Sequence, residues 1–130
     1  MSRVAVFLSF VILFLLLPFS VVSAAKKVTP ITVSALYVRP KNVVRAVFGN
    51  LKGGASSVSY TLTYDSNGIA RGVMGTFKPG KKTSSSSDLY LGTCSAKVCI
   101  QHKNVKNVKL EVVSYYTNGK STTKTYKIKY

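Results

Sequence analysis

Apolar and polar side chains alternate along several stretches of the chain after residue 29. The alternation is clearest in residues 57–64, where Val58, Tyr60, Leu62 and Tyr64 are separated by serine or threonine. A period of two places one set of side chains against a core and the other in water. This stretch is therefore predicted to be a half-buried β-strand.

Six further stretches show the same pattern less strictly and are also predicted to be strands. They are residues 33–38, 43–51, 69–77, 83–91, 108–112 and 126–130. Gly72 and Gly75 interrupt residues 69–77, which favours an edge strand there. In residues 43–51, Val44, Ala46 and Phe48 share one face and Val43, Arg45 and Val47 the other. In the last two stretches the faces predicted to meet in the core carry Val108, Leu110, Val112, Tyr126 and Ile128. No helical periodicity is present from Ala25 onward.

The last two predicted strands must pair so that their apolar faces agree. A two-residue loop of Asn118 and Gly119 would place Leu110 opposite Lys127 and so mix the two faces. A three-residue loop, 117–119, with glycine in the left-handed region, places Leu110 opposite Tyr126. The same register puts Val108 opposite Ile128 and Glu111 opposite Thr125. We predict the three-residue loop.

About seven short antiparallel strands in roughly 100 residues predict an all-β immunoglobulin-like or fibronectin type III-like sandwich. Turns are expected at residues 50–55, 65–68, 78–82 and 117–119. An open barrel is the alternative architecture. The chain has no tryptophan, and its two cysteines are too close in sequence to join two sheets, so a true immunoglobulin domain is not expected.

The N-terminus is strongly apolar. Arg3 precedes an almost unbroken run of Val, Leu, Phe and Ile, and Val22-Ser23-Ala24 offers the small residues that a signal peptidase recognises. Residues 1–24 are therefore predicted to be a hydrophobic signal helix. Because residues 4–24 are long enough to span a bilayer, an uncleaved membrane anchor is the alternative. Residues 25–32 are predicted to be a linker and residues 33–130 the sandwich domain.

The chain is very basic, with 19 Lys and Arg against three Asp and Glu. Loss of residues 1–24 would remove only Arg3 and leave a formal charge of +15 on the remaining 106 residues. A balance of this kind attracts polyanions at low salt.

The stretch LYLGTCSAKVCIQHKN, residues 89–104, contains Cys94 and Cys99, which are the only cysteines, and His102, which is the only histidine. In an exported protein a close pair of cysteines predicts a disulfide, here one that fixes a turn. A zinc site needs four ligands and this stretch supplies three among positive charges. A catalytic dithiol lacks the usual two-residue spacing. We expect a disulfide, no metal and no cofactor, with His102 a surface or turn residue.

The longer stretch LYLGTCSAKVCIQHKNVKNVKLEV resembles small exported fibronectin type III/immunoglobulin-like β-sandwich proteins of uncultured bacterial lineages, which are uncharacterised. A strand ending in Gly-Thr-Cys, four residues, a second Cys and a short histidine-containing segment carry the resemblance. The resemblance implies a fold and an extracytoplasmic location, secreted or at the cell surface. It implies no activity.

No arrangement typical of an enzyme is present. Asp65 lies in a predicted turn where it would cap backbone amides, Asp88 begins a predicted strand, and Glu111 points outward between lysines. A serine nucleophile would need a base and an orienting acid, and one histidine beside a disulfide does not supply them. We therefore expect no catalytic activity.

Lysines gather in the C-terminal third and form the second candidate site. A basic stripe is predicted from Lys103, Lys106, Lys109, Lys120, Lys127 and Lys129. It would bind wall polymer, anionic lipid or extracellular nucleic acid through contacts that weaken as salt rises. Alternatively, these lysines only solubilise the domain and protect an edge strand from pairing with another sheet.

Tyrosines near these lysines raise the question of base stacking. Tyr60, Tyr64, Tyr126 and Tyr130 fall on predicted inward faces and are expected in the core. No recognised nucleic-acid-binding module is present, so specific nucleic acid recognition is not expected.

Two functional hypotheses follow. The first is a non-catalytic exported sandwich that acts as a structural or interaction module, with an anionic cell-envelope polymer or another surface protein as partner, and with membrane contact through residues 4–24 if these are not removed. The second is a secreted basic protein that binds polyanions.

Overall fold

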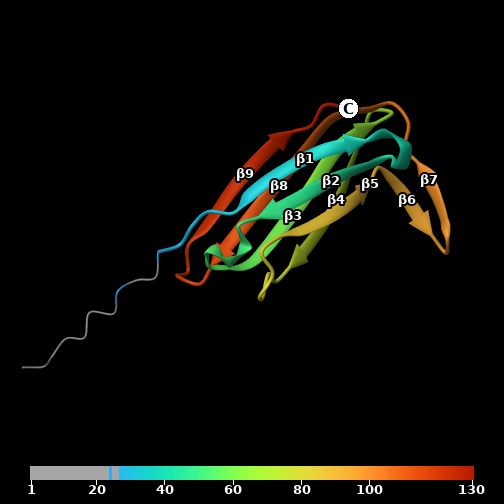
Figure 1. Ribbon diagram of the computed structural model, residues 1–130. Helices are drawn as coiled ribbons and strands as arrows, with labels where there is room; N and C mark the ends of the chain where they lie inside the picture. Colours follow the sequence, from blue (N-terminus) through green and yellow to red (C-terminus); the bar gives the residue numbers. More distant parts are fainter. Residues whose placement is uncertain (1–23, 25–26) are drawn as a thin grey trace, which may run out of the picture.

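The computed structural model describes Ala24 and residues 27–130, and these residues form an all-β fold of antiparallel sheets (Figure 1). The strands are β1 (Thr32–Val38), β2 (Val43–Gly49), β3 (Ala55–Ser66), β4 (Ile69–Phe77), β5 (Ser85–Tyr90), β6 (Gly92–Ser95), β7 (Val98–Gln101), β8 (Val105–Tyr116) and β9 (Ser121–Lys127). Two 3-10 turns, η1 (Arg39–Lys41) and η2 (Leu51–Gly53), join the first three strands.

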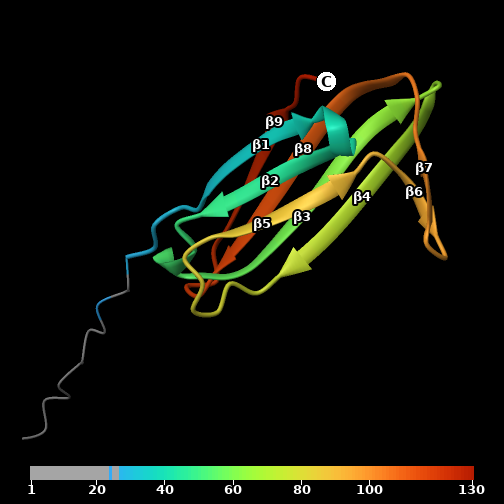
Figure 2. The ribbon, with the colours of Figure 1, turned by 45° about the vertical axis from the view of Figure 1, so that its right-hand side comes forward.

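The strands divide into two larger sheets and one small one. The first sheet has the order β1-β2-β5 and the second β4-β3-β8-β9, while β6 and β7 pair only with each other. The two larger sheets lie face to face (Figures 1 and 2). Residues from both sheets contribute to one buried cluster. The structure is therefore consistent with the predicted β-sandwich, with the β6–β7 hairpin as an addition to it.

The core follows the predicted alternation. Val44, Ala46 and Phe48 of β2 have 0 % of their surface exposed and face Leu62 and Leu110, which are equally buried. Val44, Ala46 and Phe48 were predicted to share one face of their strand, and the structure shows that this face is the inward one. Burial of apolar surface of this kind is the main stabilising contribution to such a domain.

The aromatic residues only partly match the prediction. Tyr64 is 3 % exposed, and Tyr60 and Tyr126 are partly buried against the core. Tyr130 was predicted to be in the core, and this is wrong: it is 44 % exposed and packs on Tyr37, with ring centroids 4.4 Å apart. The reason is that β9 ends at Lys127, so no sheet holds Tyr130 to the inward face.

The β8–β9 hairpin confirms the predicted register. Leu110 lies opposite Tyr126 and Glu111 opposite Thr125. The Tyr116 N–H donates to the Lys120 carbonyl at 2.9 Å, which leaves residues 117–119 as the loop. Gly119 has φ +79°, the left-handed value that this turn requires. The parity of apolar residues was therefore sufficient to fix the loop length.

The β3–β4 hairpin closes through a tighter turn. Ser66 pairs with Ile69, so Asn67 and Gly68 form a two-residue loop, and both have positive φ, as a type I′ turn needs. β4 pairs with β3 alone, which confirms the predicted edge strand with its predicted bounds.

The domain begins before its first strand. Ile31 is 4 % exposed, Val28 packs against the core, and the Thr29 N–H donates to the Gly53 carbonyl at 3.0 Å. Residues 28–31, which fall in the predicted linker, thus contact the sandwich. The predicted signal or anchor segment, residues 1–24, lies outside the described residues except for Ala24. Within the described part of the chain, neither helical segment approaches the length and hydropathy that crossing a bilayer requires.

Candidate functional site

The β6–β7 hairpin is the most distinctive feature of the surface. It extends from one end of the sandwich, away from both sheets (Figures 1 and 2). Cys94 and Cys99 lie directly opposite each other in it and form a disulfide. The predicted disulfide is confirmed, and it closes a turn at Ala96 and Lys97, as predicted. The residues around the cysteines form two short strands, which a four-residue segment between cysteines does not reveal.

The tip of the hairpin has an unfavourable backbone. Ser95 pairs with Val98, so the loop consists of Ala96 and Lys97, with φ of 44° and 74°. A two-residue loop with positive φ at both positions normally has the sequence Asn-Gly or Asp-Gly. Most other residues are strained in this conformation because their Cβ approaches the backbone too closely. The adjacent disulfide opposes this strain, since a bridge that closes so short a ring stabilises by about 2 kcal/mol.

His102 connects the hairpin to the sandwich. Its Nδ1 lies 2.9 Å from the Tyr64 hydroxyl and its Nε2 lies 3.0 Å from the Thr93 hydroxyl. Its backbone N–H donates to the Leu91 carbonyl at 3.0 Å. Burial raises the pKa of Tyr64, so that hydroxyl stays protonated over the ordinary pH range. His102 was predicted to be a surface or turn residue, whereas it is partly buried and hydrogen-bonded through both ring nitrogens.

The base of the hairpin is fixed by buried groups of the first sheet. Asn42 is 5 % exposed, and its Nδ2 donates to the Leu91 carbonyl at 2.8 Å while its Oδ1 accepts from the Tyr37 hydroxyl at 3.0 Å. A Cβ on Gly92 would collide with the Ile100 carbonyl and the Tyr90 ring, so glycine is required where the chain leaves the sandwich. The hairpin therefore has a defined orientation at its base.

The outer part of the hairpin is apolar and exposed. Val98 is 64 % exposed and Ile100 is 67 % exposed. Both lie on the face opposite the cysteines, because directly paired residues share a face and the faces alternate along a strand. Lys97 at the tip and Lys103 beyond the base add positive charge. Every residue of β6 and β7 is exposed except Gly92 at the base, which is partly buried. The hairpin thus contributes almost nothing to the core.

The predicted basic stripe is only partly assembled. Lys109 and Lys127 lie directly opposite on the outer face of the second sheet, and both are exposed. Lys106 precedes them on β8, and Lys129 follows Ile128, whose N–H donates to the Val108 carbonyl at 2.9 Å.

The two remaining lysines of the predicted stripe, Lys103 and Lys120, lie at opposite ends of the second sheet. The Lys103 carbonyl accepts a bond from the Ser66 hydroxyl at 2.8 Å, which places Lys103 near the end of the sheet that carries Lys106. Lys120 lies beyond the β8–β9 turn at the opposite end. We call Lys103, Lys106, Lys109, Lys127 and Lys129 the lysine end; Lys120 is not part of it.

Asp65 and Asp88 bind neighbouring side chains, and the predictions about these two carboxylates are wrong in detail. Asp65 was predicted to cap backbone amides, but its Oδ2 accepts a bond from Asn107 Nδ2 at 2.7 Å. Asp88 was predicted to begin a strand, but it lies within β5 opposite Arg45. Arg45 donates two hydrogen bonds of 2.7 Å to it and holds the pKa of the Asp88 carboxyl below its usual range.

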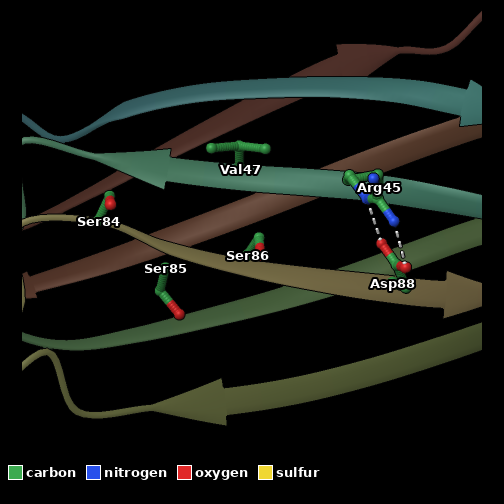
Figure 3. Close-up of a pocket in the computed structure, with 6 residues that line it drawn as sticks. All are labelled: Arg45, Val47, Ser84, Ser85, Ser86 and Asp88. Atoms are coloured by element: carbon green, nitrogen blue, oxygen red, sulfur yellow. Dashed lines mark hydrogen bonds and ion pairs between the residues drawn. The ribbon is translucent and has the colours of Figure 1, made fainter.

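A shallow depression lies beside this ion pair on the outer face of the first sheet (Figure 3). Arg45 and Asp88 point toward each other across β2 and β5, with Val47, Ser84 and Ser86 nearby. The guanidinium is already neutralised, and the lining contains neither a histidine nor a second carboxylate. The depression therefore has no group that could activate a serine. Over the described residues, no cluster of three or more His, Cys, Asp or Glu could hold a metal ion.

Comparison with protein-family models gave no match to this chain, and a search of curated proteins gave none either.

Proposed function

We propose that the chain is a non-catalytic exported β-sandwich that acts as an interaction module and contacts a protein partner through the β6–β7 hairpin. The observation that carries this proposal is the exposure of Val98 and Ile100 on a hairpin fixed at both ends. Apolar side chains on a rigid projection lose little conformational entropy on binding, which favours an interaction role.

The type of sandwich belongs to the same proposal. The division into β1-β2-β5 and β4-β3-β8-β9 supports a fibronectin type III-like domain. In constant-type immunoglobulin domains the fourth strand joins the first sheet, whereas β4 pairs with β3 here. The β6–β7 hairpin then lies in the connection between the two sheets that leads to β8.

Export is supported by two independent features. Residues 1–24 have the composition of a signal peptide or an anchor, and the Cys94–Cys99 bridge is typical of oxidising compartments. The partner would then be encountered outside the cytoplasm.

The chemistry of the hairpin specifies the partner. Val98 and Ile100 require an apolar cleft, and Lys97 and Lys103 favour acidic residues at its rim. A partner surface of that kind would bind the hairpin at its outer face while leaving the disulfide accessible.

A photo-crosslinking amino acid at position 100 of the full chain, introduced in the cells that produce it, tests the proposal. We expect a specific adduct with one protein from position 100. Excess full chain should compete for this adduct, and a Val98→Ser, Ile100→Ser variant should not.

Leu36 provides the matched control, because it is an apolar residue 53 % exposed on the outer face of β1. A crosslinker at position 36 should give no such adduct. Equal adducts from both positions would contradict the proposal, and adducts with lipid alone would indicate a membrane contact instead.

Binding of polyanions is the second candidate, and the pairing of Lys109 with Lys127 favours it. Like charges directly opposite in a sheet are destabilising, so this pair reduces stability unless an anion neutralises it. Glu111 forms no ion pair in the described structure, where Arg45 and Asp88 are the pair found.

A salt titration of the full chain with a DNA duplex and with polyacrylate tests this second candidate. If all five lysines of the lysine end contact anions, the slope of log K against log salt should be about −4.5. Lys109→Gln with Lys127→Gln should reduce the slope by about two. Lys52→Gln with Lys120→Gln removes the same charge at the other end and should leave the slope unchanged. An equal change of slope in the two double variants would show that the polyanion is attracted by the net charge of the chain and not by the lysine end.

A further inference from the structure

The two edges of the second sheet differ in how they are protected. β9 carries Lys124 and Lys127, and Lys124 lies opposite the buried Val112, so its charge sits on the inward side of an edge strand. Charge placed there prevents another strand from pairing. β4 is nine residues long and its one charged residue is Arg71. β4 is therefore the open edge.

The two large exposed hydrophobic side chains of β4 are Met74 and Ile69. Met74 is 79 % exposed and Ile69 is 53 % exposed. β4 pairs with β3 on one side, and no strand pairs with its other side in the described structure. A long edge with a single charged residue is suited to pairing with a further strand.

The hairpin geometry determines which backbone groups are free. Ser66 and Ile69 close a two-residue loop and therefore form a hydrogen-bonded pair. Hydrogen-bonded and non-hydrogen-bonded pairs alternate, so residues 69, 71, 73, 75 and 77 direct their N–H and C=O groups toward β3. The N–H and C=O groups of Ala70, Gly72, Met74 and Thr76 consequently point away from β3 and have no strand partner among the described residues.

We propose that β4 pairs with β4 of a second copy of this chain, antiparallel and with Val73 opposite Val73. In this register Gly72 faces Met74 and Ala70 faces Thr76, so all four outward-pointing residues find backbone partners. Shifting the register by two residues either way leaves one of them unpaired. A two-fold axis through Val73 makes the contact closed and self-complementary.

The side chains of β4 can also be accommodated in the register that places Val73 opposite Val73. Arg71 lies opposite Gly75, so the two arginines do not meet. Met74 lies opposite Gly72 and covers the space that the glycine leaves. Ile69 lies opposite Phe77, which pairs an apolar residue with an apolar one. Lys78 would lie opposite Gly68, an uncharged turn residue.

Net charge sets the conditions for pairing. Each copy has a formal charge of +16, so repulsion opposes association at low salt. Salt screens this repulsion, so dimerisation should strengthen as salt rises. This is the opposite of the salt dependence expected for polyanion binding.

Met74→Pro in the full chain is the direct test. Proline at position 74 removes one outward N–H per copy without disturbing the β3 ladder, and edge strands tolerate it there. Met74→Thr is the matched control, because it retains the N–H. Sedimentation velocity in a mild non-ionic detergent, at 50 and 500 mM NaCl, gives the monomer–dimer constant. Loss of two hydrogen bonds per dimer should weaken association by about thirtyfold in Met74→Pro alone.

Val73→Cys gives a second readout that does not depend on the proline. Position 73 meets itself across the axis, so mild oxidation should form a covalent dimer of the full chain. Thr125→Cys on β9 should form none. Equal dimer constants for wild type, Met74→Thr and Met74→Pro, or equal crosslinking at positions 73 and 125, would overturn the proposal.

The test of pairing through β4 is independent of the tests of the proposed function. Crosslinking from position 100 and the salt slope for DNA involve residues outside β4. Met74→Pro should therefore change neither the crosslinking from position 100 nor the salt slope, whatever their values in the wild-type chain.

Discussion

The sandwich and the β6–β7 hairpin are held together by different means. The sandwich buries residues such as Phe48, Leu62 and Leu110 completely. The hairpin buries almost none of its surface, and depends on one disulfide and on the hydrogen bonds of His102. Burial of apolar side chains stabilises the sandwich, whereas a disulfide and hydrogen bonds stabilise the hairpin.

The difference implies that the two regions can open independently. Local stability follows local contacts, so loss of the disulfide or of the His102 hydrogen bonds should open the hairpin without unfolding the sandwich. A region whose loss costs the domain little is free to serve in binding. The comparison is compatible with the proposed interaction role of the hairpin, and each prediction below tests the separation of the two regions.

A core substitution should have the largest effect. Leu110→Ala removes a side chain that is 0 % exposed, and should lower the free energy of unfolding by about 3 kcal/mol. Urea denaturation measures the loss. Leu36→Ala, at a position 53 % exposed, should change it by less than about 0.5 kcal/mol. A small effect at Leu110 would contradict the assigned core.

Removal of the disulfide should affect only the hairpin. Cys94→Ser with Cys99→Ser should lower local stability by about 2 kcal/mol, because a bridge across so short a ring stabilises by that amount. Trypsin cleavage after Lys97 should accelerate about thirtyfold, while the urea midpoint of the sandwich stays unchanged. A parallel fall in the urea midpoint would show that the two regions unfold together.

Loss of the histidine contacts should have a smaller effect. His102→Ala leaves the buried Tyr64 hydroxyl without its partner, which should cost about 1 kcal/mol. Thermal denaturation measures this loss. Tyr64→Phe combined with His102→Ala should recover part of it, because no buried hydroxyl is then left unpaired. No recovery would mean that packing of the histidine ring is the main contribution.

The strained tip gives an effect of the opposite sign. Lys97→Gly places glycine at φ 74° and should stabilise the hairpin by about 1 kcal/mol. The variant is best tested without the disulfide, where thermolysin cleavage before Val98 or Ile100 should slow. Faster cleavage would show that the left-handed tip is not a source of strain.

A pH effect on the sandwich should be the smallest. Arg45 lowers the pKa of Asp88 in the folded state below the ordinary 3.8. A carboxyl of this kind contributes stability above its unfolded pKa and loses it as the pH falls through the folded pKa. The urea midpoint should therefore decrease slightly more in wild type than in Asp88→Asn as the pH falls below 3.8. Identical decreases would mean that the exposed pair contributes nothing.

Much of the sandwich was accessible from the sequence because one face of each strand is buried. The alternation at residues 57–64 and the parity of Leu110 with Tyr126 fix faces and register without further information. Gly72 and Gly75 identified the edge strand. Gly75 is needed because the Tyr60 ring lies over it.

The hairpin was less accessible because its stabilising contacts are not periodic. Ala96 and Lys97 are not turn-forming residues, so the two-residue loop has no signal of its own. The only indication was the pair of cysteines. His102 could not be assigned a role, because Tyr64 is 38 residues away in sequence. Likewise, Arg45 and Asp88 are 43 residues apart, and strand order alone brings them together.

Amide hydrogen exchange of the full chain, with and without a mild reductant, tests the separation of hairpin and sandwich most directly. The account predicts that reduction speeds exchange about thirtyfold in β6 and β7, while β2, β3 and β8 keep their protection. Equal loss of protection in β3 and β8 would contradict it, because the hairpin would then be part of the cooperative fold.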